Sequence, residues 1–152
     1  MKLRLLGALS LGAMLIGQVA LAETVKIGFV TTLTGGAGAI GNDMRDAVEL
    51  ALDHLGRKMG ASDVEMIYED DTFKPDVGKQ KTEKLVKKDK VHFVTGYIWS
   101  HVLLASRNSV VGKGPFMITS NAGPGPVAGK LCHKDFFSTS WQNDQTTMAM
   151  GE

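Results

Sequence analysis

The sequence has almost no cysteine and no excess of charge of either sign. One cysteine, Cys132, among 152 residues excludes an internal disulfide and a cysteine-ligated zinc site within this chain. The 17 basic and 16 acidic residues give a formal net charge of +1, which offers no basic surplus for a nucleic-acid partner. Four prolines against 18 glycines favour tight turns over a proline-rich linker. With 43% apolar and 22% charged residues, the composition is that of a folded globular protein.

The first 22 residues have the layout of a secretory signal peptide. Lys2 and Arg4 precede an uncharged run over residues 5–17, and Ala20-Leu21-Ala22 forms an A-x-A cleavage site. The apolar run is shorter than the roughly 20 residues that a membrane-spanning helix needs. We therefore expect export, cleavage after Ala22, and a mature protein in the periplasm with no membrane insertion. Removal of Lys2 and Arg4 from the 17 basic residues leaves 15 against 16 acidic ones, a mature formal charge of −1.

Short runs rich in β-formers alternate with helical patterns along the rest of the chain. The predicted strands are residues 25–31, 64–68, 91–95, 116–119 and a short one at 136–138. This alternation predicts an α/β fold, a Rossmann-like parallel sheet flanked by helices and wound right-handed. Ligands bind beyond the carboxyl ends of the strands in such sheets. We therefore expect the site on the loops 33–42, 69–74, 96–101 and 119–126.

The predicted helices have recognisable starts. The most regular apolar spacing follows Asn42 or Asp43, either of which can cap a helix, and Gly56 is placed to end it. Pro75 suits the first turn of a second helix, and Ser100 can cap a third.

The segment Gly36 to Gly41 matches the dinucleotide fingerprint G-x-G-x-x-G, between a strand and a helix. The extended run ends near Thr32, so Leu33, Thr34 and Gly35 stand before the first motif glycine, whereas the fingerprint turn is tight. The next acidic residue at a strand end, Glu69, lies 28 positions after Gly41 rather than about 20. We interpret the segment as a flexible loop that lines a cleft, and we expect no cofactor.

Other catalytic or metal-binding patterns are weak. The four histidines lack the paired spacing of a metal site, and the acidic cluster Glu69–Asp71 is interpreted as a solvated loop. Ser100 and His101 are neighbours on a predicted helix, where adjacent side chains point apart, so they do not form a nucleophile–base pair. The sequence therefore predicts a protein that is not an enzyme.

An ordered series of segments resembles the leucine/isoleucine/valine-binding protein family, the type I periplasmic binding proteins that serve ABC importers. The segments are Val25–Gly35, the helix from Asp43, Tyr68–Asp71 with Pro75, Val94–Gly96 with Ser100, and Met117–Thr119. The resemblance implies two α/β lobes that trap a ligand between them, in proteins roughly twice this length or more. It implies that residues 23–141 are the first segment of an incomplete N-terminal lobe and that residues 142–152 start the hinge and second lobe.

The resemblance also implies a ligand site. Ser100 and the segment Asn121-Ala122-Gly123 stand where the family holds the carboxylate and ammonium of its ligand. Trp99 and Trp141 are expected to supply an apolar wall, and Ile40 stands where an aromatic residue often faces the ligand.

Two departures from the family pattern affect this expectation. Gly123 replaces the usual threonine, the partner of the ammonium, which favours an apolar or aromatic carboxylate over an α-amino acid. Phe73 and Trp99 occupy positions that form a disulfide in some members.

We therefore expect a monomeric substrate-binding component of an ABC importer. It would bind a small carboxylate, such as a branched-chain amino acid or an aromatic acid, and deliver it to the permease. Two alternatives stay open. A ligand-sensing receptor domain of the same fold would need a transmembrane segment downstream, and an exported α/β enzyme would need a convergent nucleophile and base.

Overall fold

The computed structural model describes residues 23–148, 150 and 151; the expected signal peptide lies outside this range. Six strands form one sheet: β1 (Val25–Thr31), β2 (Lys58–Met59), β3 (Ser62–Asp70), β4 (Phe93–Gly96), β5 (Phe116–Thr119) and β6 (Phe136–Ser138). Their order across the sheet is β2-β3-β1-β4-β5-β6, and all neighbours are parallel except the short β2–β3 pair. The predicted α/β class with a parallel sheet is confirmed.

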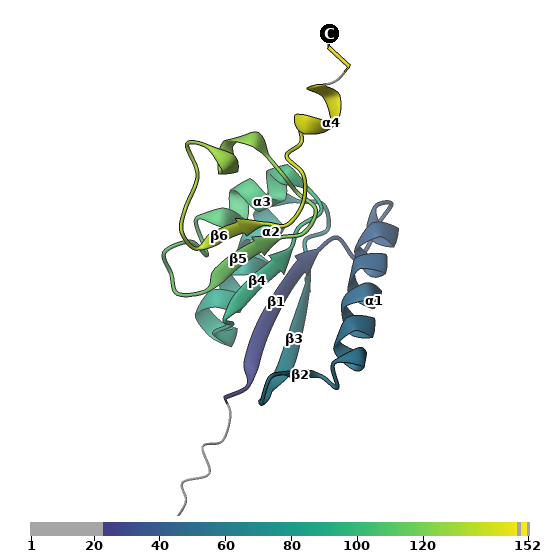
Figure 1. Ribbon diagram of the computed structural model, residues 1–152, viewed down its shortest axis with the longest axis vertical. Coiled ribbons are helices and arrows are strands. Elements are labelled where there is room, and N and C mark those ends of the chain that lie inside the picture. Colours follow the sequence, from purple (N-terminus) through teal and green to yellow (C-terminus); the bar gives the residue numbers. More distant parts are fainter. Residues whose placement is uncertain (1–22, 149, 152) are drawn as a thin grey trace, which may run out of the picture.

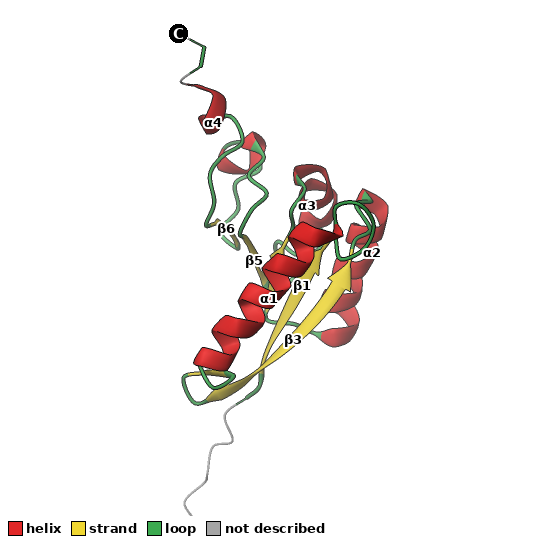
Figure 2. Cartoon of the chain, turned by 90° about the vertical axis from the view of Figure 1, so that its right-hand side faces the viewer, coloured by secondary structure: helices red, strands yellow, loops and turns green. Residues whose placement is uncertain are grey.

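Helices cover both faces of this sheet. They are α1 (Gly38–His54), α2 (Pro75–Lys84) continued by the π-helical turn η1 (Leu85–Asp89), α3 (Ser100–Arg107), the 3-10 turn η2 (Gly125–Ala128) and the short α4 (Gln145–Met148). Figure 2 shows α1 on one side of the sheet and α2 and α3 on the other, which is the arrangement that parallel strands require. No helix in the described part of the chain is long and apolar enough to span a bilayer.

The predicted strands agree with the observed ones within a few residues, but β2 was not predicted. β2 has two residues and pairs only with the start of β3, so it has no periodicity to detect. The central strand β1 pairs with β3 on one side and β4 on the other, in a register that sets Val30 opposite both Glu69 and Gly96.

The prediction that α1 begins at Asn42 or Asp43 is wrong, because the helix already begins at Gly38. Gly41 packs so closely on the preceding loop that an added Cβ would lie 1.9 Å from the carbonyl oxygen of Thr32. The Asn42 amide does not cap the helix; its Nδ2 donates to the carbonyls of Gly38 and Leu33, at 2.7 and 3.1 Å. The glycines therefore let a helix start directly against the end of β1.

The apolar stripe of α1 is covered less than its spacing predicts. Leu52 is buried, whereas Leu55 at the helix end is 64% exposed. A polar contact adds to the attachment of this helix, since the Tyr68 hydroxyl on β3 donates to Glu49 Oε1 at 2.6 Å. Figure 1 shows α1 beside β1 and β3 and away from β5 and β6.

The core lies between the sheet and the pair α2–α3. Its fully buried side chains include Val30, Leu85, Val94, Tyr97, Val102, Leu103 and Met117. On the opposite sheet face Phe93, Phe116 and Phe137 follow one another across β4, β5 and β6, with neighbouring ring centroids about 6 Å apart (5.9 and 6.1 Å).

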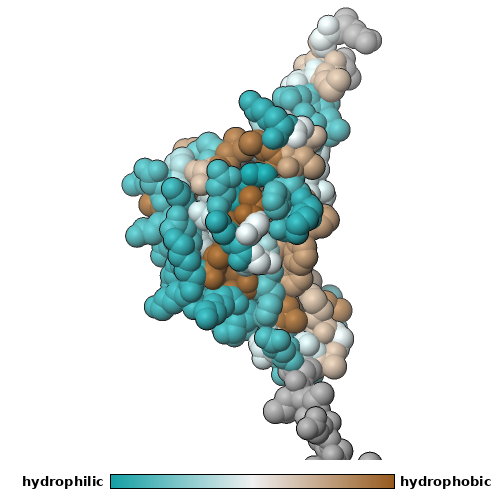
Figure 3. Space-filling view, turned by 90° about the vertical axis from the view of Figure 1, so that its left-hand side faces the viewer, coloured by the Kyte–Doolittle hydropathy of each residue, from teal (hydrophilic) through white to brown (hydrophobic). Residues whose placement is uncertain are grey.

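Figure 3 shows one side of the molecular surface, where hydrophilic residues surround smaller apolar patches.

Candidate functional site

The loops that follow β1, β3 and β4 are tied together at the carboxyl edge of the sheet. The Trp99 indole Nε1–H donates to Thr32 Oγ1 at 2.9 Å, and the Thr32 hydroxyl donates to Asp71 Oδ1 at 2.5 Å. Thr32 follows β1 directly and Asp71 follows β3 directly, so the parallel register brings the two side chains together. This is the edge at which the sequence predicted a site.

An aromatic cluster stands on these loops. The rings of Phe73 and Trp99 meet edge to face with centroids 4.7 Å apart, and Phe73 is 5.1 Å from the His101 ring. The side chains of Phe73 and Trp99, on two different loops, are thus direct neighbours. A cavity of about 350 Å³ lies beside the pair, lined by Thr34, Gly35, Gly36, Ala37, Thr72, Phe73 and Trp99. The cavity is therefore bounded by the glycine-rich loop on one side and by two aromatic rings on the other.

Ser100 differs from its predicted role as a cap. The cap position of α3 is Trp99, and Ser100 is the first residue of the helix. Its hydroxyl accepts a hydrogen bond from Asn143 Nδ2 at 2.9 Å, and the Asn143 N–H donates to the Gly123 carbonyl at 2.7 Å. Because the first N–H groups of a helix have no partner within it, the Ser100 end of α3 suits a carboxylate.

The loop after β5 lies against the loop after β4. The Asn121 amide donates to the Ile98 carbonyl at 3.0 Å, and the Ala122 N–H donates to the Tyr97 carbonyl at 3.0 Å. Ala122 is buried in the core, so its methyl group packs there. Asn121 is half-buried. Of Asn121 and Ala122, it is therefore Asn121 whose side chain can reach a ligand.

The remaining predicted site residues are less closely grouped. The carbonyl of Trp141 packs onto Gly123, while the Trp141 side chain is 54% exposed. Ile40 lies in the first turn of α1, is 48% exposed, and does not line the cavity. The fold thus gathers Trp99, Ser100 and the 121–123 segment at one edge, with the backbone of Trp141 beside them.

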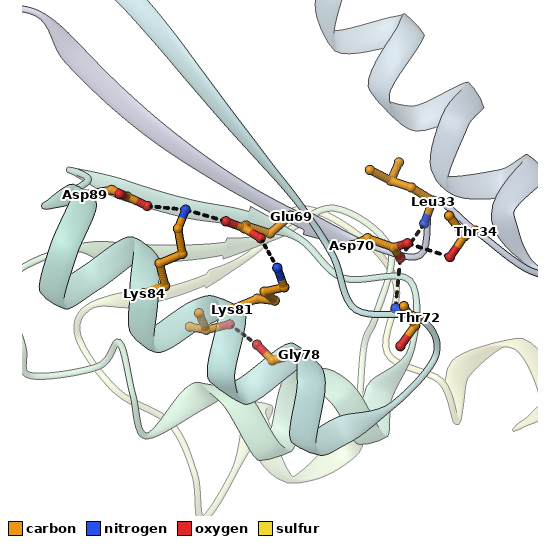
Figure 4. A network of polar contacts seen from close by, with 10 residues as sticks. Leu33, Thr34, Glu69, Asp70, Thr72, Gly78, Lys81, Lys84 and Asp89 are labelled. Carbon is orange, nitrogen blue, oxygen red and sulfur yellow. Dashed lines mark hydrogen bonds and ion pairs between the residues drawn. The ribbon is translucent and has the colours of Figure 1, made fainter.

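The interpretation of residues 69–71 as a solvated loop is wrong. Glu69 is buried and pairs with Lys81 and Lys84 on α2, at 2.8 and 2.6 Å (Figure 4). Asp71 is fully buried. The strand register places these side chains within the fold, and α2 covers them. Their burial cannot be inferred from the hydrophilic character of the residues alone.

Asp70 holds the loop after β1 in place. Its oxygens accept hydrogen bonds from the Leu33 N–H, the Thr34 hydroxyl and the Thr72 N–H, at 2.9, 2.6 and 2.8 Å (Figure 4). Burial raises the pKa of Asp70, but these donors outweigh burial and hold the pKa below its usual value. Burial also raises the pKa of Glu69, and the hydrogen bonds from Lys81 and Lys84 reverse that effect, so its pKa is lowered too.

Sequence reasoning missed Thr32, Asp71 and Asn143. Thr32 and Asp71 each follow the last residue of a strand, so a correct pairing of β1 with β3 would have placed them side by side. Asn143 had no comparable signal, because it reaches Ser100 across 43 residues of chain. Within the described residues, no cluster of three or more His, Cys, Asp or Glu side chains is arranged to hold a metal ion.

Known proteins share this architecture. An ABC transporter substrate-binding protein from Sphaerobacter thermophilus is 31% identical with a TM-score of 0.76, over 81% of this chain and 34% of that protein. A solute-binding protein from R. palustris, solved in complex with benzoate, is 25% identical with a TM-score of 0.76, over 80% of this chain and 34% of that protein.

Among curated sequences, the Leu/Ile/Val-binding protein BraC3 of Rhizobium johnstonii is 27% identical over 124 residues, which is 80% of this chain and 33% of that protein. The chain thus spans about a third of the length of this relative. Residues 24–152 match the family described as Periplasmic binding protein. This match and the shared fold show that the chain belongs to the periplasmic binding protein family.

Proposed function

We propose that this chain is the N-terminal part of a solute-binding protein of an ABC importer that binds a small carboxylate with an apolar or aromatic body. Residues 1–22 direct export and are removed, so the mature protein acts in the periplasm without catalysing a reaction. Residues 23–141 are the first segment of the N-terminal lobe, and residues 142–152 lead into the hinge. Closure of two lobes on the ligand then presents a surface to the permease.

One observation carries the proposal: the consecutive residues Trp99 and Ser100 offer the apolar surface and the hydrogen-bond donors that such a ligand needs. Trp99 lines the cavity together with Phe73, and Ser100 begins α3 with its hydroxyl and N–H groups at the same edge. Asn121 adds an amide from the neighbouring loop. An apolar wall beside a few polar groups is the usual composition of a small-molecule site.

Two further observations support an aromatic acid over an α-amino acid. Gly123 offers no hydroxyl for an ammonium group, and its surroundings leave no room for a side chain. The similar R. palustris protein was solved with benzoate bound.

The test is a thermal-shift screen of the complete protein with benzoate, 4-hydroxybenzoate, leucine and isoleucine. A ligand that binds only the native state at 100 times its Kd stabilises it by about 2.7 kcal/mol, a shift of several degrees in Tm. We expect the two aromatic acids to give the larger shifts. Exclusive stabilisation by leucine and isoleucine would contradict the preference for an aromatic acid over an α-amino acid, and no shift with any of them would contradict the carboxylate specificity.

Variants then test the site itself. Ser100→Ala and Asn121→Ala should each weaken binding of the responding acid about tenfold or more, because each removes a donor to a charged group. Ser109→Ala is the matched control, since Ser109 lies just beyond the far end of α3. Unchanged affinity in both site variants would show that the carboxylate binds elsewhere.

A further inference from the structure

A chain of hydrogen bonds with a fixed direction runs from the aromatic cluster into the protein. The indole N–H of Trp99 can only donate, so Thr32 Oγ1 accepts it at 2.9 Å. The single hydroxyl proton of Thr32 is then directed to Asp71 Oδ1, 2.5 Å away. Thr32 and Asp71 are both fully buried, which shields the hydrogen bond between them from competition with water. Trp99 is half-buried and donates to this buried acceptor from the edge of the sheet.

The same carboxylate oxygen also holds Phe73. The Phe73 N–H donates to Asp71 Oδ1 at 2.9 Å, and Phe73 has a left-handed backbone with φ of +64°. Left-handed conformations are unfavourable for residues with a bulky side chain unless other contacts maintain them. Asp71 therefore orients both aromatic residues, Phe73 through its backbone and Trp99 through Thr32.

The arrangement has an energetic cost. Asp71 Oδ2 is buried and has no hydrogen-bond partner among the described residues, so the carboxylate is held through one oxygen. A buried polar atom without a partner lowers stability. A role in positioning the aromatic pair accounts for a carboxylate in this location.

We infer that Thr32 and Asp71 are positioning residues that lock Trp99 and Phe73 as the apolar wall of the ligand site. Because Thr32 occupies the only polar group of the Trp99 side chain, the wall offers the ligand no hydrogen bond. It therefore selects a carboxylate whose body is apolar or aromatic at this point. The inference rests on the proposed function, which it extends to the residues that determine specificity.

The experiment follows the Trp99 indole N–H in the complete, ¹⁵N-labelled protein by NMR. Its signal is identified as the one that disappears in Trp99→Phe. In the wild type we expect this proton to exchange with solvent at least about tenfold more slowly than an exposed indole N–H. Thr32→Val should remove the protection, and Thr32→Ser, which keeps the hydroxyl, should restore it. Rapid exchange in the wild type would overturn the inference before any variant is made.

Binding of benzoate by calorimetry supplies the second readout. We expect Thr32→Val to raise the Kd about tenfold and Thr32→Ser to recover most of the affinity. Thr31→Val is the matched control, since Thr31 is also fully buried but its Oγ1 has no hydrogen-bond partner among the described residues. Equal affinities of Thr32→Val and Thr31→Val would overturn the positioning role while leaving the proposed function intact. A wild type that binds none of the carboxylates would overturn the proposed function, and with it the role in ligand selection, even with a protected indole.

Discussion

The carbonyl oxygen of Trp141 lies 1.9 Å from the point where a Cβ atom of residue 123 would be. The chain after β6 thus passes directly over Gly123, and the Asn143 N–H bonds to the Gly123 carbonyl at 2.7 Å. In this conformation no side chain fits at position 123. The glycine at position 123, in place of the threonine that the family resemblance leads us to expect, is therefore coupled to the path of residues 141–143.

Introducing the missing side chain should destabilise the protein. Gly123→Thr forces the 141–143 segment away, and overpacking of this kind costs about 1–3 kcal/mol. Denaturant unfolding should show a lower midpoint, whereas Ser120→Thr, at an exposed position in the same loop, should change little. Equal stability of Gly123→Thr and the wild type would mean that residues 141–143 can move away from position 123 at little cost in free energy.

The two ends of the glycine motif should respond differently to alanine. Gly41→Ala places a Cβ 1.9 Å from the Thr32 carbonyl, so we expect a loss of about 1–3 kcal/mol in the free energy of unfolding. At Gly36 an added Cβ meets nothing within 4 Å, so Gly36→Ala should change stability by less than about 0.5 kcal/mol. Comparable losses in the two variants, measured by chemical denaturation, would argue against a packing role specific to Gly41.

Asp70 should make the free energy of unfolding depend on pH. Its pKa is lower in the folded protein than the usual 3.8, because the donors from Leu33, Thr34 and Thr72 outweigh burial. The unfolded chain therefore binds the proton more readily, and the contribution of Asp70 is fully present above about pH 5 and lost as the pH falls below 4.

Asp70→Asn should remove this contribution. Near pH 7 the variant should be less stable by about 1–2 kcal/mol, because hydrogen bonds to a charged acceptor are replaced by weaker ones. The difference from the wild type should shrink as the pH falls towards 3, as followed by Tm at a series of pH values. A difference that stays constant over this range would show that protonation of Asp70 is not coupled to folding. Asp63→Asn is a control, since the Asp63 side chain is 73% exposed.

Much of the fold could be predicted from local patterns. β1, β5 and β6 have the predicted bounds because their apolar runs are short, rich in β-formers and bounded by turn residues. The start of α1 could not be predicted, because helix propensity is poor for glycine. The close approach of Gly38 to the Leu33 carbonyl and of Gly41 to the Thr32 carbonyl is a tertiary feature that local patterns do not contain.

The candidate site was predictable only in part. Trp99, Ser100 and Asn121 follow strands, and strand ends of a parallel sheet lie at one edge, so their approach follows from topology. The roles of Thr32 and Asp71 depend on which strands are neighbours, and the contact of Asn143 with Ser100 depends on the return of the chain after β6.

Residue spacing and turn chemistry were sufficient to predict the alternation of strands and helices, the parallel sheet and the edge at which the candidate site is expected. The three-dimensional arrangement was needed to show that residues 69–71 are held by internal partners, that Ser100 bonds to Asn143, and that the polar atom of Trp99 is bonded inside the protein. Each of these depends on the neighbours of a polar side chain in space, and those neighbours come from distant segments that local patterns do not specify.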